Sequence, residues 1–179
     1  MDLSFELGTM EDLDELEQLY DGLNLYLSQT VNYPGWRKGL YPTRQTALDG
    51  IMENRLYVIK HHGKVIASTI IRNTPEEAYY EAKWQTEDDY EKIGVIYTFA
   101  VHPGYLKQGV GRKLLEFIID TCRSRGFHAI RLDAYAENVP AIKLYEACGF
   151  EYIATVDLGL AEYGLDEFKL YEYVISEEW

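Results

Sequence analysis

The chain has 179 residues, of which 47% are hydrophobic, a size that fits one compact domain, residues 1–179, and is short for two. Its net charge is -13, from 30 acidic against 17 basic residues. Such a field repels polyphosphates, which argues against nucleic acid as a partner and favours a cationic or amine substrate. Acidic surface also keeps a protein soluble, so the charge alone identifies no acceptor.

Metal, disulfide and membrane chemistry are not expected. Cys122 and Cys148 lack CxxC spacing, and the four histidines show no metal-ligand spacing. The N-terminus has no basic region followed by an apolar run, and no apolar stretch approaches the roughly 18 residues of a membrane span. The sequence therefore predicts a cytoplasmic protein without a metal, a disulfide or a membrane segment.

The N-terminal half begins with strand-like alternation at Leu3–Leu7. Thr9 and Asp12 form a variant capping box, and leucines at helical spacing predict a helix that extends to Leu27. Val31–Tyr41 contains a proline and two glycines and is predicted to be a loop, with a second helix after Pro42–Thr43.

A β-hairpin and a buried strand follow. Arg55–Lys60 and Lys64–Arg72 are rich in β-formers and flank the turn His61–Gly63. Residues 74–92 are polar and aromatic, and their pattern predicts no regular element. Ile93–Val101 is apolar throughout, as expected of a central strand buried on both faces.

The C-terminal half alternates helices and strands. Helices are predicted at Lys107–Arg125 and Asn138–Cys148, strands at His128–Ala134, 150–158 and 167–175. The order β-α-α-β-β-β-α-β-α-β-β predicts an α/β fold with a mixed, mostly antiparallel twisted sheet of about seven strands and helices on both faces.

The segment after Val101 has the features of an anion cradle. A strand leads into a turn that contains Gly109 and Gly111, and a long helix begins within that turn. Unpaired amides at a helix start bind anions, and glycine lets the backbone approach them closely. The nucleotide-binding alternatives fail, because Val110–Gly111 replaces the lysine and hydroxyl of a P-loop and Leu114 replaces the third glycine of a dinucleotide fingerprint.

Two motifs resemble those of a known family. VHPGYLKQGVGRKLLEF, residues 101–117, resembles motif A of the GNAT superfamily of acyl-CoA N-acyltransferases, and NVPAIKLYEACGF, residues 138–150, resembles its motif B. The resemblance covers about residues 55–152 and implies acetyl-CoA as co-substrate. One position departs from the family pattern, because Leu106 stands where Arg or Gln is usual.

The resemblance also implies roles for individual residues. The backbone of Phe99, Ala100 and Val101 would bind the pantetheine arm as an added strand. Amides from Lys107, Gln108, Gly109, Val110, Gly111 and Arg112 would hold the diphosphate. Asn138 would hydrogen-bond the pantetheine arm, and Tyr145 would direct its hydroxyl at the coenzyme sulfur.

N-acetylation needs two proton transfers. A lysine-like amine has a pKa of about 10.4 and must lose a proton before it attacks, while the departing thiolate needs a proton donor. Tyr145 suits the second task, with an ordinary tyrosine pKa near 10. The base stays open among Asp133, Glu137, Glu91, Glu81 and a water chain. The resemblance further implies that backbone N–H groups near Phe99 stabilise the tetrahedral oxyanion.

The acceptor and the functional class stay open in the sequence. Tyr33, Trp36 and Tyr41 lie on a turn-rich loop and are either the walls of a pocket for an amine or a cover for the core. The first hypothesis is a small-molecule N-acetyltransferase. The alternatives are acetylation of protein N-termini or lysines, and a non-catalytic acyl-CoA sensor. Exposed terminal strands also make a homodimer an open expectation.

Overall fold

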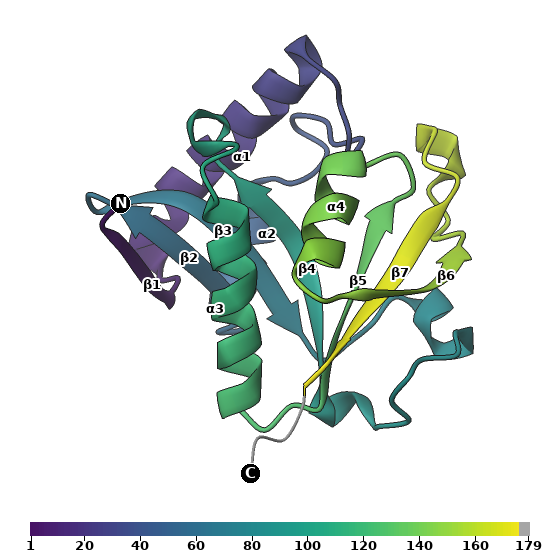
Figure 1. The fold of residues 1–179 in the computed structure, drawn as a ribbon. Helices are drawn as coiled ribbons and strands as arrows, with labels where there is room; N and C mark the ends of the chain where they lie inside the picture. The colour runs from purple at the N-terminus through teal and green to yellow at the C-terminus, as the bar shows by residue number, and fades with distance from the viewer. Residues whose placement is uncertain (176–179) are drawn as a thin grey trace. The chain divides into compact units, whose positions relative to one another are not determined.

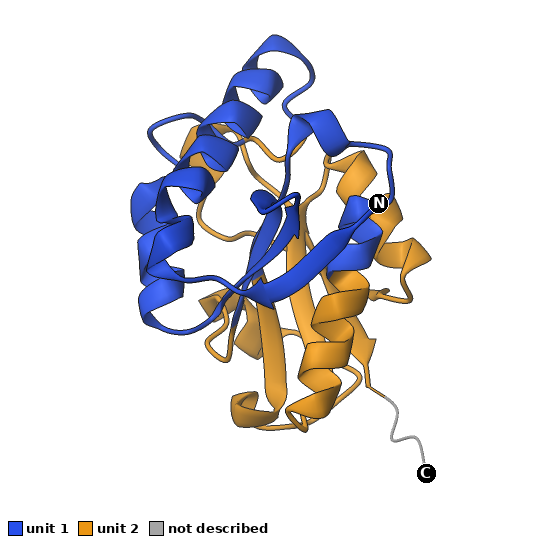
Figure 2. Ribbon diagram, turned by 90° about the vertical axis from the view of Figure 1, so that its left-hand side faces the viewer, with its two compact units in different colours: residues 1–32, 36–71, 97–114 blue, residues 33–35, 72–96, 115–179 orange. Residues whose placement is uncertain are grey.

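The computed structural model describes residues 1–175 (Figure 1) and comprises two compact units (Figure 2). Unit 1 contains Met1–Asn32, Trp36–Ile71 and Tyr97–Leu114. Unit 2 contains Tyr33–Gly35, Arg72–Ile96 and the chain from Leu115 onward. Seven strands in the order β1-β2-β3-β4-β5-β7-β6 confirm the predicted mixed sheet.

Unit 1 begins with an edge strand and a capped helix. β1 (Leu3–Leu7) pairs antiparallel with β2 (Leu56–His61). The short 3-10 helix η1 (Met10–Asp12) then leads into α1 (Leu13–Gln29). The predicted capping box is present, because the Thr9 amide donates to Asp12 Oδ2 at 2.9 Å. That bond satisfies a donor at the helix start, where none of the helix's own carbonyls is available.

The remaining elements of unit 1 enclose its core. α2 (Arg44–Met52) is followed by the hairpin of β2 and β3 (Lys64–Arg72), as predicted. His62 and Gly63 take φ values of 51° and 75°, the pair of left-handed residues that a two-residue hairpin turn requires. The apolar faces of α1, α2, β2 and β3 bury one cluster, which includes Leu16, Leu19, Ala47, Leu56 and Ile70.

Unit 2 contains the segment for which the sequence predicted no regular element. Residues 74–92 form two 3-10 helices, η2 (Glu77–Glu81) and η3 (Tyr90–Lys92), ahead of β4 (Ile93–Val101). The first residues of β4, Ile93–Val95, pair in parallel with Ala129–Arg131 of β5 (Ala129–Tyr135). β7 (Phe168–Val174) pairs antiparallel with both β5 and β6 (Glu151–Val156).

Two further α-helices are α3 (Val110–Ser124) and α4 (Val139–Ala147), and a 3-10 helix, η5 (Ala161–Tyr163), precedes β7. α3 begins three residues later than the sequence predicted. The reason is local, because Lys107 and Gly109 have φ values of 61° and 79°, which a right-handed helix does not accommodate. Among the described residues, no helix is both long and apolar enough to cross a membrane.

Candidate functional site

The end of β4 lies in unit 1, and its backbone departs from regular strand geometry. Thr98 has a φ of 51°, which is rare for a β-branched residue. Its hydroxyl forms a short hydrogen bond with the Tyr41 hydroxyl, and the residue is buried. A left-handed residue inside a strand is typical of a bulge, which changes the direction of the strand. The backbone of Phe99, Ala100 and Val101 directly follows this irregular position in β4.

The loop between β4 and α3 contains a 3-10 turn, and its last main-chain amides lie at the start of α3. η4 (Pro103–Tyr105) is stabilised by the Gly104 amide, which donates to His102 Nδ1 at 2.9 Å. Gln108 is held by its side-chain amide, which donates to the Gly104 carbonyl at 3.0 Å. The first helical bond runs from the Lys113 amide to the Gly109 carbonyl at 3.1 Å, so the helix itself offers no acceptor to the amides of Val110 and Gly111.

This loop fits a diphosphate. A Cβ built on Gly109 would meet no atom within 4 Å, so the backbone is open to a ligand on that side. Lys107 and Arg112 are exposed and add positive charge to the dipole of α3. Leu106 is 37% exposed and adds no polar atom. Main-chain amides, rather than a single side chain, are therefore the principal donors of this loop.

Two of the three predicted acceptor residues, Trp36 and Tyr41, contact one another within unit 1. Trp36 and Tyr41 belong to unit 1 and stack edge to face, with ring centroids 5.7 Å apart. Tyr33 belongs to the short segment of unit 2 and is exposed. Tyr41 is fixed at both ends, because its carbonyl accepts from Asn24 Nδ2 at 3.2 Å and its hydroxyl bonds Thr98.

Unit 2 contributes α4 and its tyrosine. Asn138 caps the helix, with Oδ1 accepting from the Ala141 amide at 3.4 Å. Tyr145 is 5% exposed, and its ring packs near Phe150. Burial, together with the nearby charge of Asp133, raises the pKa of the Tyr145 hydroxyl well above its ordinary value of 10.0. The phenol therefore stays protonated at neutral pH and suits a hydrogen-bond donor better than a strong acid.

Asp133 differs from the other candidate bases. Burial raises the pKa of its carboxyl from 3.8 to about 6, against the lowering effect of a hydrogen bond from Tyr79. The Tyr79 hydroxyl donates to Asp133 Oδ2 at 2.5 Å. As a residue Asp133 is only partly buried, so it keeps some access to solvent although its carboxyl is desolvated. Glu81, Glu91 and Glu137 are exposed.

Two other features of the described residues carry no catalytic assignment. No group of three or more His, Cys, Asp and Glu side chains in residues 1–175 is arranged to hold a metal ion. Unit 2 has an open hollow of about 590 Å³ beside η2 and β6, but neither Tyr145 nor Asp133 lines it. We therefore assign the chemistry by the side chains and not by this hollow.

Sequence reasoning missed Tyr79 and Thr98. Tyr79 is one of 16 tyrosines and lies in a segment without periodicity, so no sequence signal distinguishes it. Thr98 lies within an unbroken apolar run that indicates a regular strand, and its left-handed backbone is visible only in the structure.

Comparisons with known proteins identify a family for this chain. The sequence model of the Acetyltransferase (GNAT) family matches residues 16–150, which include the loop, Asp133 and Tyr145. The chain is 46% identical over 55 residues to the [Ribosomal protein bS18]-alanine N-acetyltransferase of Escherichia coli strain K12, covering 31% of this chain and 37% of that protein. It is 38% identical over 96 residues to the mycothiol acetyltransferase of Beutenbergia cavernae, covering 54% of this chain and 31% of that protein. These matches span about a third of the relatives' length.

Solved structures share the fold across nearly the whole chain. The crystal structure of the Escherichia coli ribosomal-protein-S18-alanine N-acetyltransferase matches with a TM-score of 0.69 and 21% identity, covering 99% of this chain and 97% of that one. A GNAT-family acetyltransferase from Streptococcus agalactiae matches with a TM-score of 0.80 and 18% identity, covering 98% and 96%. The protein yncA of Salmonella typhimurium, solved with its cofactor acetyl-CoA, matches with a TM-score of 0.70 and 17% identity, covering 100% and 97%.

Proposed function

Because the chain belongs to the Acetyltransferase (GNAT) family, we propose that it is an acetyl-CoA-dependent N-acetyltransferase whose acceptor is an amine-bearing small molecule. The observation that carries the proposal is the desolvation of two titratable side chains of unit 2, Asp133 and Tyr145. The charge of the Asp133 carboxyl acts on the Tyr145 hydroxyl, and the two groups have opposite protonation preferences near neutral pH. One can accept a proton while the other donates a hydrogen bond.

Acetyl-CoA supplies the activated acetyl group as a thioester. Under this proposal the loop amides from Lys107 to Arg112 bind its diphosphate, and the backbone of Phe99, Ala100 and Val101 binds the pantetheine arm. The open backbone at Gly109 and the left-handed Lys107 support this assignment. Asn138 is proposed as a further contact to the pantetheine arm, and the family match from 16 to 150 supports treating 1–179 as one N-acetyltransferase domain.

The reaction balances with two proton movements. The acceptor nitrogen forms a C–N bond with the acetyl carbon as the C–S bond breaks, and the ammonium gives up two protons in total. We assign the first to Asp133, directly or through water, and from there to solvent. The second replaces the acetyl group on sulfur, where Tyr145 donates a hydrogen bond to the departing thiolate. With a pKa of about 6, Asp133 is ionised at neutral pH and ready to accept a proton.

Trp36 and Tyr41 support an aromatic acceptor site, with Tyr33 as a further candidate. Their edge-to-face pair presents ring faces that attract a cation, and the net charge of -13 favours a cationic acceptor at long range. One observation favours a second candidate function, acetylation of a protein N-terminal alanine. It is the 46% identity over 55 residues to a protein named for that reaction.

A thiol-release assay tests the proposal. Acetyl-CoA is offered with three acceptor sets: small polyamines and amino acids, lysine peptides, and peptides with N-terminal alanine. We expect coenzyme A release with the first set, and mass spectrometry should show a gain of one acetyl group on nitrogen. Release only with alanine peptides would select the second candidate. No release of coenzyme A with any of the three sets, despite measured acetyl-CoA binding, would favour a non-catalytic acyl-CoA sensor and contradict the proposal.

A further inference from the structure

The segment between β3 and β4 attaches to one face of β5 through side chains that the reaction scheme above does not use. Arg131 and Asp133 are two residues apart on β5, so both side chains project from the same face. Residues 79–90 contact both of them. We call this segment the strap. It contains Tyr79, which reaches Asp133, and Thr86 and Tyr90, which reach Arg131.

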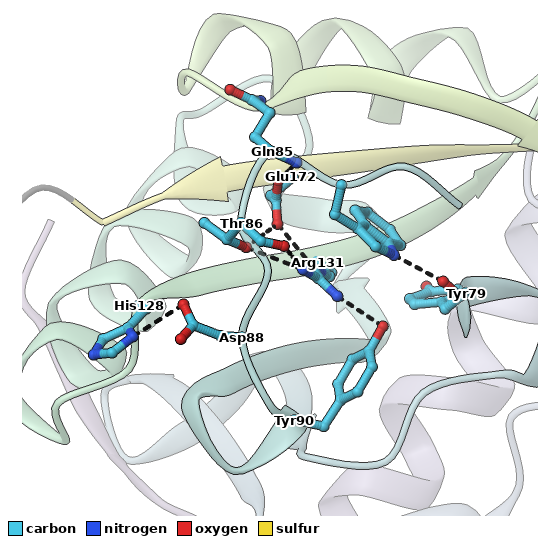
Figure 3. A network of polar contacts seen from close by, with 9 residues as sticks. Tyr79, Gln85, Thr86, Asp88, Tyr90, His128, Arg131 and Glu172 are labelled. Atoms are coloured by element: carbon cyan, nitrogen blue, oxygen red, sulfur yellow. Dashed lines mark hydrogen bonds and ion pairs between the residues drawn. The ribbon is translucent and has the colours of Figure 1, made fainter. Parts of the chain in front are cut away.

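The strap is anchored by a buried ion pair, drawn in Figure 3. Arg131 and Glu172 are direct cross-strand partners on β5 and β7, and Arg131 Nε donates to Glu172 Oε2 at 2.8 Å. Both residues are almost fully buried. An ion pair without solvent is tolerated only when its remaining donors and acceptors are satisfied.

Main-chain and side-chain groups of the strap form hydrogen bonds with the remaining donors and acceptors of the ion pair. The Thr86 carbonyl and the Tyr90 hydroxyl accept from the Arg131 guanidinium at 2.8 and 2.9 Å. The Gln85 amide donates to Glu172 Oε1 at 2.7 Å. The strap and the ion pair therefore depend on one another, since removing either leaves buried polar groups without partners.

Trp84 connects this anchor to Tyr79. Its ring lies under the Arg131 guanidinium, 4.3 Å from ring centroid to Cζ. Its indole N–H donates to the Tyr79 carbonyl at 2.8 Å, and its ring packs 5.3 Å from the Tyr79 ring. Tyr79 is fully buried, and its hydroxyl donates to Asp133. A continuous set of contacts thus runs from the ion pair to the Asp133 carboxyl.

We propose that Tyr79 is a positioning residue for Asp133: its hydroxyl fixes Oδ2 and leaves Oδ1 for the proton of the acceptor amine. The inference rests on the proposed function, in which Asp133 is the base. Oδ1 of Asp133 has no hydrogen-bond partner within residues 1–175. A phenol that donates to a carboxylate stabilises its ionised form, so Tyr79 keeps Asp133 available as a base although it is buried.

The other groups that face Asp133 have the opposite effect or none. The charge of Glu76, just before η2, raises the pKa of Asp133. Tyr145 faces it from α4 as a neutral phenol. Arg131 is engaged by Glu172 on the same sheet face. Tyr79 is therefore the one described hydrogen-bond donor that offsets burial and the charge of Glu76.

The test compares Tyr79→Phe with Tyr80→Phe. Tyr80 is the next residue and 65% exposed, and Tyr80→Phe keeps the ring that packs 5.5 Å from Tyr90. The control therefore makes the same chemical change without removing the hydrogen bond to Asp133. Removing the Tyr79 hydroxyl should move the acidic limb of the kcat/KM profile upward by roughly one pH unit. At pH 6 the rate should fall about fivefold, and by pH 9 it should recover to within about twofold of wild type. Tyr80→Phe should leave the profile in place.

A second readout does not depend on turnover. A carboxyl whose folded-state pKa is raised contributes stability below about pH 4, and that stability is lost as pH rises to about 6. In Tyr79→Phe this loss should extend about one unit higher. An unmoved limb together with an unmoved stability curve, or an equal loss of rate at every pH, would overturn the inference.

Two results separate this inference from the proposed function. If no amine is acetylated by any variant, the proposed function fails while the stability curves still test the Tyr79–Asp133 bond. If Asp133→Asn is inactive but Tyr79→Phe keeps the wild-type profile, the function stands and the positioning role fails. Should Tyr79→Phe not fold, Trp84→Phe removes the N–H that holds the Tyr79 carbonyl. It should shift the limb upward by a smaller amount, and no shift would overturn the inference.

Discussion

The loop after β4 and the strap-covered face of β5 differ in the chemical groups that they offer, which are main-chain groups in the first and side chains in the second. In the loop, the groups suited to binding are main-chain amides around Gly109, with exposed side chains beside them. On β5, the groups suited to chemistry are side chains whose behaviour depends on burial and on neighbours that are distant in sequence, such as Tyr79 and Glu172. Binding by main-chain amides should tolerate changes of side chain and weaken when a substitution changes φ. Catalysis by side chains should be lost when a single functional atom is removed.

The largest expected effect is at Asp133. Asp133→Asn keeps the shape and still accepts from Tyr79, but it cannot take a proton, so kcat/KM should fall about 10²- to 10⁴-fold. Because the folded protein no longer holds a desolvated carboxylate, its unfolding free energy at pH 7 should rise by at most about 3 kcal/mol, less the solvent screening of a partly exposed residue. Steady-state kinetics and urea unfolding at pH 4 and pH 7 check both effects. Wild-type activity in this variant would remove Asp133 as the base.

The buried ion pair of Arg131 and Glu172 should affect the free energy of unfolding more than it affects turnover. Arg131→Met leaves Glu172 buried without its cation and should lower the unfolding free energy by about 3–5 kcal/mol. The double change Arg131→Met with Glu172→Leu removes both charges and should recover much of the loss, since apolar replacements of buried ion pairs are often neutral. Denaturant unfolding measures both variants. An equal loss in the single and double variants would show that packing, and not the unpaired charge, is responsible.

Tyr145 should affect turnover without affecting coenzyme binding. Tyr145→Phe removes the donor to the departing thiolate and should reduce kcat roughly 10²-fold, while acetyl-CoA affinity stays within about twofold. Tyr152→Phe is the matched control, because Tyr152 is 54% exposed and its hydroxyl contacts only Thr155 among the described residues. A variant with unchanged kcat would assign proton donation to water.

The smallest expected effect is in the loop and tests its backbone. Gly109→Val forces a β-branched residue to a φ of 79°, at a cost of roughly 1–2 kcal/mol, and should weaken acetyl-CoA binding about tenfold. Gly126→Val is the control, because Gly126 has a φ of 78° and equally open space, but ends α3 instead of preceding it. Both variants should lose similar stability in unfolding experiments, and only the first should lose affinity. Equal affinities would exclude Gly109 from the binding site.

The same contrast explains what the sequence could predict. The glycine turn, the capping box at Thr9 and the cap at Asn138 act within a few residues of the chain, so local spacing is enough to locate them. Asp133 was one of four acidic candidates, because desolvation depends on what covers it. Tyr79 lies 54 residues from Asp133 in sequence, inside a segment without periodicity, and only tertiary structure brings the two together. The predicted start of α3 lies three residues before the observed one, because lysine is not a residue type that indicates a left-handed helix boundary.

The most direct test of the account is calorimetric titration of the folded protein with acetyl-CoA, compared with acetyl-pantetheine, which has the same thioester and no diphosphate. If the amides from Lys107 to Arg112 hold the diphosphate, acetyl-CoA should bind and acetyl-pantetheine should bind at least tenfold more weakly. No detectable heat with acetyl-CoA, or equal affinity for the two compounds, would contradict the central claim.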